Sequence, residues 1–422
     1  MSLTTRREFT LGALALGGTA ATWGASAGAS NASAGAIDQV LSKGIARRKI
    51  PAVTAMVASR DRILYAGAFG KRDFTSGPDV TIDSIFAIAS MTKAITSTAA
   101  LQLVEQGKMT LEEPVSRHLP ELAGAQVLEG FDAAGKPKLR PVRTPITLKH
   151  LLTHTSGFCY DVWSPEMTQW EQATGTTLNP ANVAPLVPLV FEPGTRWQYG
   201  YSLDWTGRLV EAVSGLSLEE YMQRTILRPL GMTDTTFVFP EGKFDRLVTG
   251  ASRQATGELA PNARALPPRP AAFNGGGGLY STCGDYVKFM QMILRRGTAA
   301  DGARILRADT VARMSSNQIG ALAAGRLETQ RPAVSADVDL HPDAPDRWGL
   351  GFLINEVGYP GGRAAGSLAW AGIFNTFYWI DPRSDRCAVI MMQFLPFVDE
   401  QAVGLLHDFE QVVYARLGRF KR

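Results

Sequence analysis

The chain has 422 residues, of which 45% are hydrophobic and 19% are charged, an ordinary composition for a globular protein with a large core. The formal net charge is only +4, and no dense basic run carries interleaved aromatic residues, which argues against nucleic acid as a partner. Length alone allows two or three domains, or one large enzyme with an inserted subdomain.

Residues 1–34 are predicted to be an export signal. Residues 5–10 carry a twin-arginine pattern, residues 11–23 are apolar and rich in Gly and Ala, and residues 25–27 and 32–34 are small-residue candidates for cleavage. The apolar stretch is too short and too rich in glycine for stable membrane insertion. We therefore expect a bacterial precursor that uses the twin-arginine (Tat) export machinery, and a mature protein in the periplasm or outside the cell.

The predicted elements begin with an amphipathic helix, followed by a β-hairpin, a strand-like run and a long apolar helix. Their expected bounds are 36–48 for the first helix, 53–57 and 63–69 for the hairpin strands, 82–89 for the strand-like run, and a start at Ser90 and an end near Gly107 for the long helix. Short helices and long loops follow to about residue 190, and two helices are then expected at 203–213 and 218–227, split by Gly215.

The last third of the chain begins with a glycine run at 275–278. The run lacks the G-K-[ST] of a phosphate loop, so it predicts a close approach of two backbones or the floor of a cleft. A helix at 285–294 follows, with Ser281 or Thr282 as its cap. Three antiparallel strands are then expected at 367–370, 376–380 and 387–393, and a final helix at 400–417. A helix and a hairpin at the start of the chain, with strands and a helix at its end, imply one sheet built from both chain ends.

Cys159, Cys283 and Cys387 form an odd set without a C-x-x-C pair. An exported protein could pair two of them, but buried free thiols are the simpler interpretation. The five histidines are scattered, without an H-E-x-x-H motif or a Cys/His cluster, so a metal site has little support. We expect neither a metal nor another cofactor.

Ser90-Met91-Thr92-Lys93 carries the main functional signal. Ser90 and Lys93, three residues apart at a helix start, lie about one turn apart on one face. A serine hydroxyl is a weak nucleophile unless a base takes its proton, and a lysine amine is such a base in its neutral form, which burial favours. The positive end of the helix dipole favours developing anions. The stretch therefore predicts acyl transfer through a serine ester, although a helix cap followed by a solvated lysine would have the same sequence.

Together with four further motifs in order, this stretch resembles the serine β-lactamase and penicillin-recognising superfamily, most closely the class C β-lactamase-like esterases (family VIII carboxylesterases). The motifs are L-L-T-H-T-S-G at 151–157, P-G-T-R-W-Q-Y at 193–199, L-G-M-T-D-T at 230–235 and G-G-G-L-Y-S-T at 276–282. The resemblance spans about residues 36–415 of a hydrolase domain expected at 36–422. It implies a β-lactamase/transpeptidase-like α/β fold of the α+β type. An antiparallel sheet flanked by helices (about 36–110 and 270–422) would carry an inserted, mostly helical lobe (about 110–270), with the active site between the two parts.

The superfamily's second motif, Tyr-x-Asn, is matched by Tyr199-Gly200-Tyr201. The resemblance implies that Tyr199 shares proton transfer with Lys93, donating to the leaving oxygen and accepting from an attacking water. Tyr201 is the alternative tyrosine. It stands where the superfamily has Asn, so an amide that would bind a substrate's amide carbonyl is missing, and we assign Tyr201 to the substrate-binding set.

The third motif, Lys-Thr-Gly in lactamases, is matched by Trp370-Ala371-Gly372. The resemblance implies that these three residues contact substrate and that the backbone N–H groups of Ser90 and Ile373 form the oxyanion hole. Glycine lets substrate lie against the strand edge. The lactamase lysine helps to grip a substrate carboxylate, whereas a tryptophan carries no charge and suits an uncharged acyl or alcohol group. This difference favours ester hydrolysis over β-lactam hydrolysis.

The sequence thus predicts a serine hydrolase that acts through an acyl-enzyme on a small-molecule ester, or on an amide. The alternatives are a β-lactamase or D-Ala-D-Ala carboxypeptidase, an acyltransferase that uses the same acyl-enzyme, and a non-catalytic peptidoglycan-binding homologue. His154 is expected to be structural rather than part of a Ser-His-Asp triad. The G-x-S-x-G pattern at 24–28 lies inside the presumed signal, which argues against an α/β-hydrolase.

Overall fold

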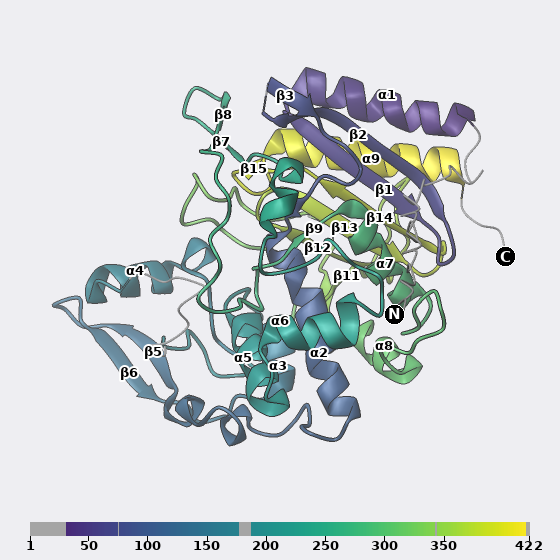
Figure 1. The fold of residues 1–422 in the computed structure, drawn as a ribbon. Helices are drawn as coiled ribbons and strands as arrows, with labels where there is room; N and C mark the ends of the chain where they lie inside the picture. Colours follow the sequence, from purple (N-terminus) through teal and green to yellow (C-terminus); the bar gives the residue numbers. More distant parts are fainter. Residues whose placement is uncertain (1–30, 75, 177–186, 342–343, 419–422) are drawn as a thin grey trace, which may run out of the picture.

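The computed structural model describes residues 31–74, 76–176, 187–341 and 344–418 (Figure 1). The twin-arginine pattern and the candidate cleavage site at 25–27 lie outside these residues. The first helix, α1 (Asn31–Arg48), begins earlier than the sequence predicts and includes the second candidate cleavage site at 32–34. No helix among the described residues is long and apolar enough to cross a bilayer.

One eight-stranded antiparallel sheet forms the centre of the molecule, with the strand order β10-β11-β12-β13-β14-β1-β2-β3. The N-terminal strands are β1 (Ala52–Ala58), β2 (Ile63–Asp73) and β3 (Ser76–Asp79). The C-terminal strands are β10 (Arg347–Trp348), β11 (Leu353–Ile354), β12 (Leu368–Gly372), β13 (Thr376–Asp381) and β14 (Arg386–Met391). Because β14 pairs with β1, the sheet is built from both chain ends, as predicted.

Helices cover both faces of the sheet, and neighbouring residues of β13 show which helix lies on which face. Trp379 contacts Phe409 of α9 (Glu400–Leu417), with ring centroids 5.7 Å apart, whereas Tyr378 contacts Tyr286 of α7 (Cys283–Leu294) at 5.0 Å. Successive side chains of a strand point to opposite faces, so α9 and α7 lie on opposite sides. α1 lies alongside α9 (Figure 1). The expected sheet flanked by helices is therefore confirmed.

Most of the segment between about 110 and 250 forms a lobe at one side of the sheet (Figure 1). Its helices are α3 (Leu148–Leu152), α4 (Pro165–Thr174), α5 (Ser202–Ser214), α6 (Leu218–Met222) and the π-helical turn η5 (Gln223–Leu227), joined by the 3₁₀ turns η2 (Val115–Arg117), η3 (Pro120–Gly124), η4 (Asp161–Trp163) and η6 (Glu241–Arg246). Gly215 ends α5 with a positive φ of 72°, which glycine adopts without strain, so the predicted split between two helices is confirmed.

The lobe also contains a hairpin, β5 (Gln126–Phe131) and β6 (Pro137–Pro141), that the sequence analysis missed. The β6 strand is largely exposed and has proline at both ends, so it lacks the alternating apolar pattern of a buried strand. A second hairpin, β7 (Ala251–Arg253) and β8 (Leu259–Pro261), joins β15 (Phe394–Leu395) in a small separate sheet.

The strand-like run at 82–89 is a strand over only two residues, β4 (Phe86–Ala87), which pairs with β9 (Tyr280–Ser281). The rest of that prediction is wrong, because β9 offers only a two-residue partner. After β4 the chain enters the 3₁₀ turn η1 (Ala89–Met91) and then α2 (Thr92–Glu105). The remaining helix is α8 (Ala308–Met314). Thr282 caps α7 by accepting from the Asp285 backbone N–H at 3.2 Å, as predicted.

All three cysteines are buried and unpaired, which confirms the simpler of the two interpretations of their odd number. Burial raises the pKa of each thiol above its usual value. These side chains therefore behave as small apolar groups of the core rather than as reactive thiols.

Candidate active site

Ser90 lies in η1, directly before α2, and its side chain is half-buried. Lys93, in the first turn of α2, is 1% exposed, and its Nζ lies 3.2 Å from Ser90 Oγ. Ala89, the residue before the serine, has a positive φ of 43°, an uncommon conformation for a residue with a side chain. The structure thus brings the hydroxyl and the amine of the S-x-x-K motif together, with the amine away from bulk solvent.

The amine of Lys93 has two further polar neighbours. Its Nζ lies 2.6 Å from the carbonyl oxygen of Gly276 and 3.1 Å from Tyr160 Oη. It also lies over the ring of Tyr199, 4.7 Å from the ring centroid. Among the described residues, this buried amine is therefore bound by Ser90, Tyr160 and Gly276.

The glycine run at 275–278 packs directly against α2 and α5. A Cβ atom at Gly276 would overlap the carboxylate of Asp204, and one at Gly275 would lie 2.6 Å from the Leu203 carbonyl oxygen. Thr96 Oγ1, one turn after Lys93, donates to the Gly275 carbonyl at 2.6 Å. The predicted close approach of two backbones is confirmed, and it is what allows a backbone carbonyl to reach the lysine amine.

Tyr199 is also buried beside Lys93, but its hydroxyl bonds elsewhere. The indole N–H of Trp370 donates to Tyr199 Oη at 3.1 Å, and the two rings are tilted with centroids 4.8 Å apart. The match to Tyr-x-Asn predicts that Tyr199 shares proton transfer with the amine of Lys93. In the structure the ring of Tyr199 meets it, and the hydroxyl that reaches the amine belongs to Tyr160.

Tyr160 was missed by the sequence analysis because it matches no motif of the superfamily. It lies three residues after Gly157 in the loop before η4, and only the tertiary fold brings it to Lys93. Its hydroxyl donates to Asp204 Oδ2 at 3.1 Å. Burial, together with the negative charge of Asp204, raises the pKa of Tyr160 well above its usual value.

Tyr201, assigned to substrate binding from the sequence, is only 3% exposed. Its hydroxyl donates to Asp161 Oδ1 at 3.3 Å, and its ring packs against the ring of Tyr160 with centroids 4.3 Å apart. The Tyr201 hydroxyl is thus engaged by Asp161 and its ring supports Tyr160, and its place in the substrate-binding set stays a prediction.

The third motif lies at the end of β12, next to the turn that carries Ser90. A Cβ atom at Gly372 would overlap the carbonyl oxygen of Ile88, two residues before Ser90, so glycine is required where the strand passes the turn. Ala371 is buried, and Ile373, half-buried, follows the end of the strand. This close approach places the backbone of Ile373 beside the segment that contains Ser90.

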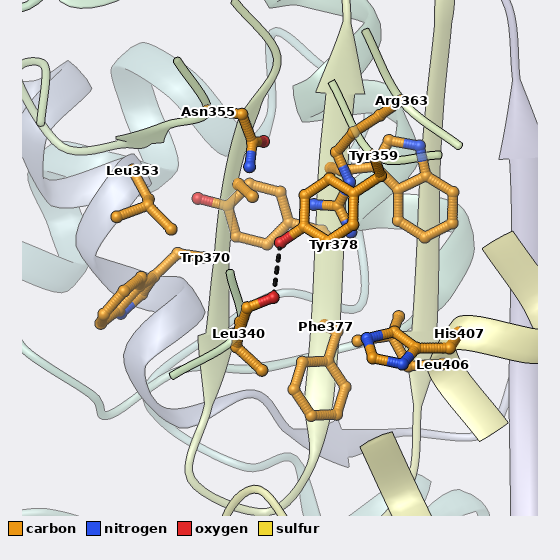
Figure 2. Close-up of a pocket in the computed structure, with 12 residues that line it drawn as sticks. Leu340, Leu353, Asn355, Tyr359, Arg363, Trp370, Phe377, Tyr378, Leu406 and His407 are labelled. Atoms are coloured by element: carbon orange, nitrogen blue, oxygen red, sulfur yellow. Dashed lines mark hydrogen bonds between the residues drawn. The ribbon is translucent and has the colours of Figure 1, made fainter. Parts of the chain in front are cut away.

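Trp370, the first residue of that motif, also lines a small cavity of about 20 Å³ (Figure 2). Leu353 and Asn355 also line this cavity, and the Tyr359 hydroxyl at its edge donates to the Leu340 carbonyl at 2.9 Å. Trp370 is 6% exposed and meets Trp348 edge-on at 4.8 Å. The indole is thus held in place by packing, with its N–H aimed at Tyr199.

His154 is fully buried behind Tyr199, with ring centroids 4.6 Å apart. Burial lowers the pKa of His154 well below its usual value, so the ring is neutral. Its Nδ1 accepts from the Gly200 backbone N–H at 3.4 Å. These contacts support a structural role in holding the Tyr199 segment.

The Beta-lactamase family model matches residues 37–411 of the chain. The chain belongs to the beta-lactamase family. It is 32% identical to monacolin J acid methylbutanoyltransferase of Aspergillus terreus, over 89% of this chain and 94% of that protein. It is 33% identical to lovastatin esterase of Penicillium rubens, over 88% of this chain and 95% of that protein.

Among solved structures, this beta-lactamase family member is similar to unliganded simvastatin synthase of Aspergillus terreus. The TM-score is 0.78 at 30% identity, and the match covers 92% of this chain and 99% of the other. The β-lactamase/transpeptidase-like fold expected from the sequence is therefore confirmed. Relatives of similar identity thus carry the names of a methylbutanoyltransferase and of an esterase.

Proposed function

We propose that this beta-lactamase family member cleaves carboxylic esters through an acyl-enzyme on Ser90. The observation that carries the proposal is the distance of 3.2 Å between Lys93 Nζ and Ser90 Oγ, with the amine buried and the hydroxyl half-buried. A nucleophile and a base within hydrogen-bond reach, in a site largely closed to water, are what covalent acyl transfer needs.

In the proposed first step, neutral Lys93 takes the proton of Ser90 while Ser90 Oγ attacks the ester carbonyl carbon. The carbonyl oxygen becomes an oxyanion, which the backbone N–H groups of Ser90 and Ile373 would hold. The C–O bond to the alcohol then breaks, and the departing oxygen takes a proton from Tyr199. Lys93 passes to Tyr199 the proton that it received from Ser90, so both groups return to their starting states. Water attacks the acyl-enzyme in the second step, releases the acid and returns the proton to Ser90.

In this scheme Tyr199 would serve the leaving oxygen. Because Trp370 N–H already donates to Tyr199 Oη, the phenol's own hydrogen is left for another acceptor. A general acid must have its proton free to transfer, so this arrangement supports the role that the sequence analysis gave to Tyr199.

The charges around the site support neutral ester substrates. Trp370 stands where a lactamase has a lysine, and Lys93 is engaged by its three neighbours. Arg331 is bound by Asp161, at 2.8 Å, and by Glu171. Among the described residues, we therefore assign to the site no unpaired cation that could hold a substrate carboxylate.

Acyl transfer to an alcohol is a second candidate, because relatives that cover most of the chain are named as a methylbutanoyltransferase and as simvastatin synthase. The acyl-enzyme on Ser90 would be the same, and only the group that attacks it would differ. The two candidates separate when the products are measured in the presence of an added alcohol.

The proposal is tested by comparing p-nitrophenyl butyrate with the β-lactam nitrocefin, which carries a carboxylate. We expect kcat/KM for the ester to exceed that for nitrocefin by about 10²-fold or more, in line with the cost of leaving a substrate charge without a partner. Faster turnover of nitrocefin would contradict the proposal. With 1-butanol added, butyl butyrate as the main product would assign the enzyme to acyl transfer, and butyric acid to hydrolysis.

A further inference from the structure

Lys93 must direct its hydrogen bonds correctly if it is to act as the base. A neutral amine has two N–H groups and one lone pair, and the lone pair has to face the Ser90 O–H to receive its proton. The carbonyl oxygen of Gly276, 2.6 Å away, can only accept, so it takes one N–H. The second N–H must then go to Tyr160 Oη at 3.1 Å, and Tyr160 has to accept it.

Whether Tyr160 accepts depends on where its own proton points. A phenol can donate to Lys93 or accept from it, and a donated bond would occupy the lone pair that Ser90 needs. Asp204 Oδ2 lies 3.1 Å from Tyr160 Oη. An ionised carboxylate can only accept, so it draws the phenol hydrogen to itself and leaves a lone pair of Tyr160 facing Lys93.

We propose that Asp204 is a positioning residue that acts through Tyr160 to fix the direction of the hydrogen bond between Lys93 and Ser90. The inference rests on the proposed function, because it gives a direction to the same proton transfer. Asp204 does not contact Ser90. Its effect is relayed through two hydrogen bonds, one that Tyr160 donates to Asp204 and one that Lys93 donates to Tyr160.

The local structure is built around this carboxylate. Asp204 is 3% exposed and lies in the first turn of α5, where the positive end of the helix dipole stabilises a negative charge. Residue 276 has to be glycine for the carboxylate to fit. A buried carboxylate is costly, so its placement here needs a compensating role.

The groups that face Asp204 come from four segments: Lys93 of α2, Tyr160 of the loop before η4, Tyr201 at the start of α5, and Asn274 of the glycine run. His154 lies near Lys93 and is neutral. Burial raises the pKa of Asp204 to about 6. Below that pH the carboxyl gains a proton that it can donate to Tyr160, so kcat/KM should fall as the pH drops through about 6.

The test is a double-mutant cycle with Asp204→Asn and Tyr160→Phe, assayed on p-nitrophenyl butyrate. The asparagine amide can donate to Tyr160, so Asp204→Asn should lower kcat by about 10²-fold, the scale of general-base catalysis, with KM within about twofold. Once Tyr160→Phe has removed the relay, adding Asp204→Asn should change kcat by less than about twofold, because the two sites are coupled. The fall in kcat/KM near pH 6 should be absent from Asp204→Asn.

Asp285→Asn is the matched control, since Asp285 is also buried in the first turn of a helix, α7. We expect the Asp285→Asn variant to lose as much thermal stability as Asp204→Asn does, but to keep the wild-type kcat. Unchanged kcat and pH profile in Asp204→Asn would overturn the inference, and so would an equal loss in the Tyr160→Phe background. Tyr160→Phe alone should lower kcat, which provides a second arm if Asp204→Asn does not fold.

Labelling by a fluorophosphonate separates this inference from the proposed function. If wild-type Ser90 is not labelled, the proposed function fails. If wild-type Ser90 is labelled and Asp204→Asn is labelled at the same rate, only the positioning role of Asp204 fails.

Discussion

Replacing Ser90 with alanine should lower kcat for p-nitrophenyl butyrate by about 10⁴-fold or more, the scale seen when a serine nucleophile is removed. The reason is that, among the described residues, no other hydroxyl is placed to attack next to Lys93 Nζ: Ser90 Oγ is 3.2 Å from it, and the Tyr160 hydroxyl is bound to Asp204. The half-buried Ser90 side chain loses only one oxygen, so the fold should persist. The measurement is steady-state hydrolysis together with thermal unfolding of both proteins.

Ser97→Ala is the matched control for that experiment. Ser97 lies on the same helix and is fully buried, and its Oγ has no hydrogen-bond partner among the described residues. The change should leave kcat within about twofold of wild type, as expected for a residue without a contact to the reacting atoms. Ester hydrolysis that survives Ser90→Ala would show that the nucleophile is a different residue.

Replacing Lys93 with methionine should lower kcat by about 10²- to 10⁴-fold, the range for loss of a general base. Methionine has a similar length and suits a buried position, so the loss should come from chemistry more than from packing. The Gly276 carbonyl would lose its partner, which costs about 1–3 kcal/mol of stability. The measurement is kcat from pH 7 to 9, with the folded fraction determined by circular dichroism.

Lys288→Met provides the comparison for Lys93→Met. Lys288 also bonds a backbone carbonyl, that of Gly231, and an Asp285 oxygen at 2.9 Å, but it lies on α7, outside the site. We expect the Lys288→Met variant to be less stable than the wild type and to have the same kcat. If Lys93→Met keeps wild-type kcat at any of these pH values, Lys93 is not the base that activates Ser90.

The parts of the fold that sequence patterns predict best are those with regular periodicity and clear end signals. α9 spans Glu400–Leu417, as expected, because apolar residues recur at helical spacing and Asp399 caps its first turn. The hairpin of β1 and β2 is confirmed for a similar reason: a short polar turn joins two apolar runs. The exposed β5–β6 hairpin lacks that pattern, and β4 has too short a partner to extend.

In the candidate site, too, a contact set by local helix geometry can be predicted from the sequence, whereas contacts set by tertiary packing cannot. Ser90 and Lys93 are neighbours because helix geometry places residues three apart on one face, so the sequence is enough to predict their contact. Tyr160 reaches Lys93 from a loop 67 positions away, and only tertiary packing brings the two together. The hydroxyl of Tyr199 points to Trp370 for the same kind of reason, since the tilt of an aromatic ring follows from its neighbours and not from its spacing in the chain.

The most direct test of the account is mass spectrometry of the protein after a short reaction with p-nitrophenyl butyrate, followed by peptide mapping. A butyryl group on Ser90, present in the wild type and absent from Ser90→Ala, is the result we predict. A butyryl group on another residue, or turnover of the ester by a wild-type protein that never carries one, would contradict the account.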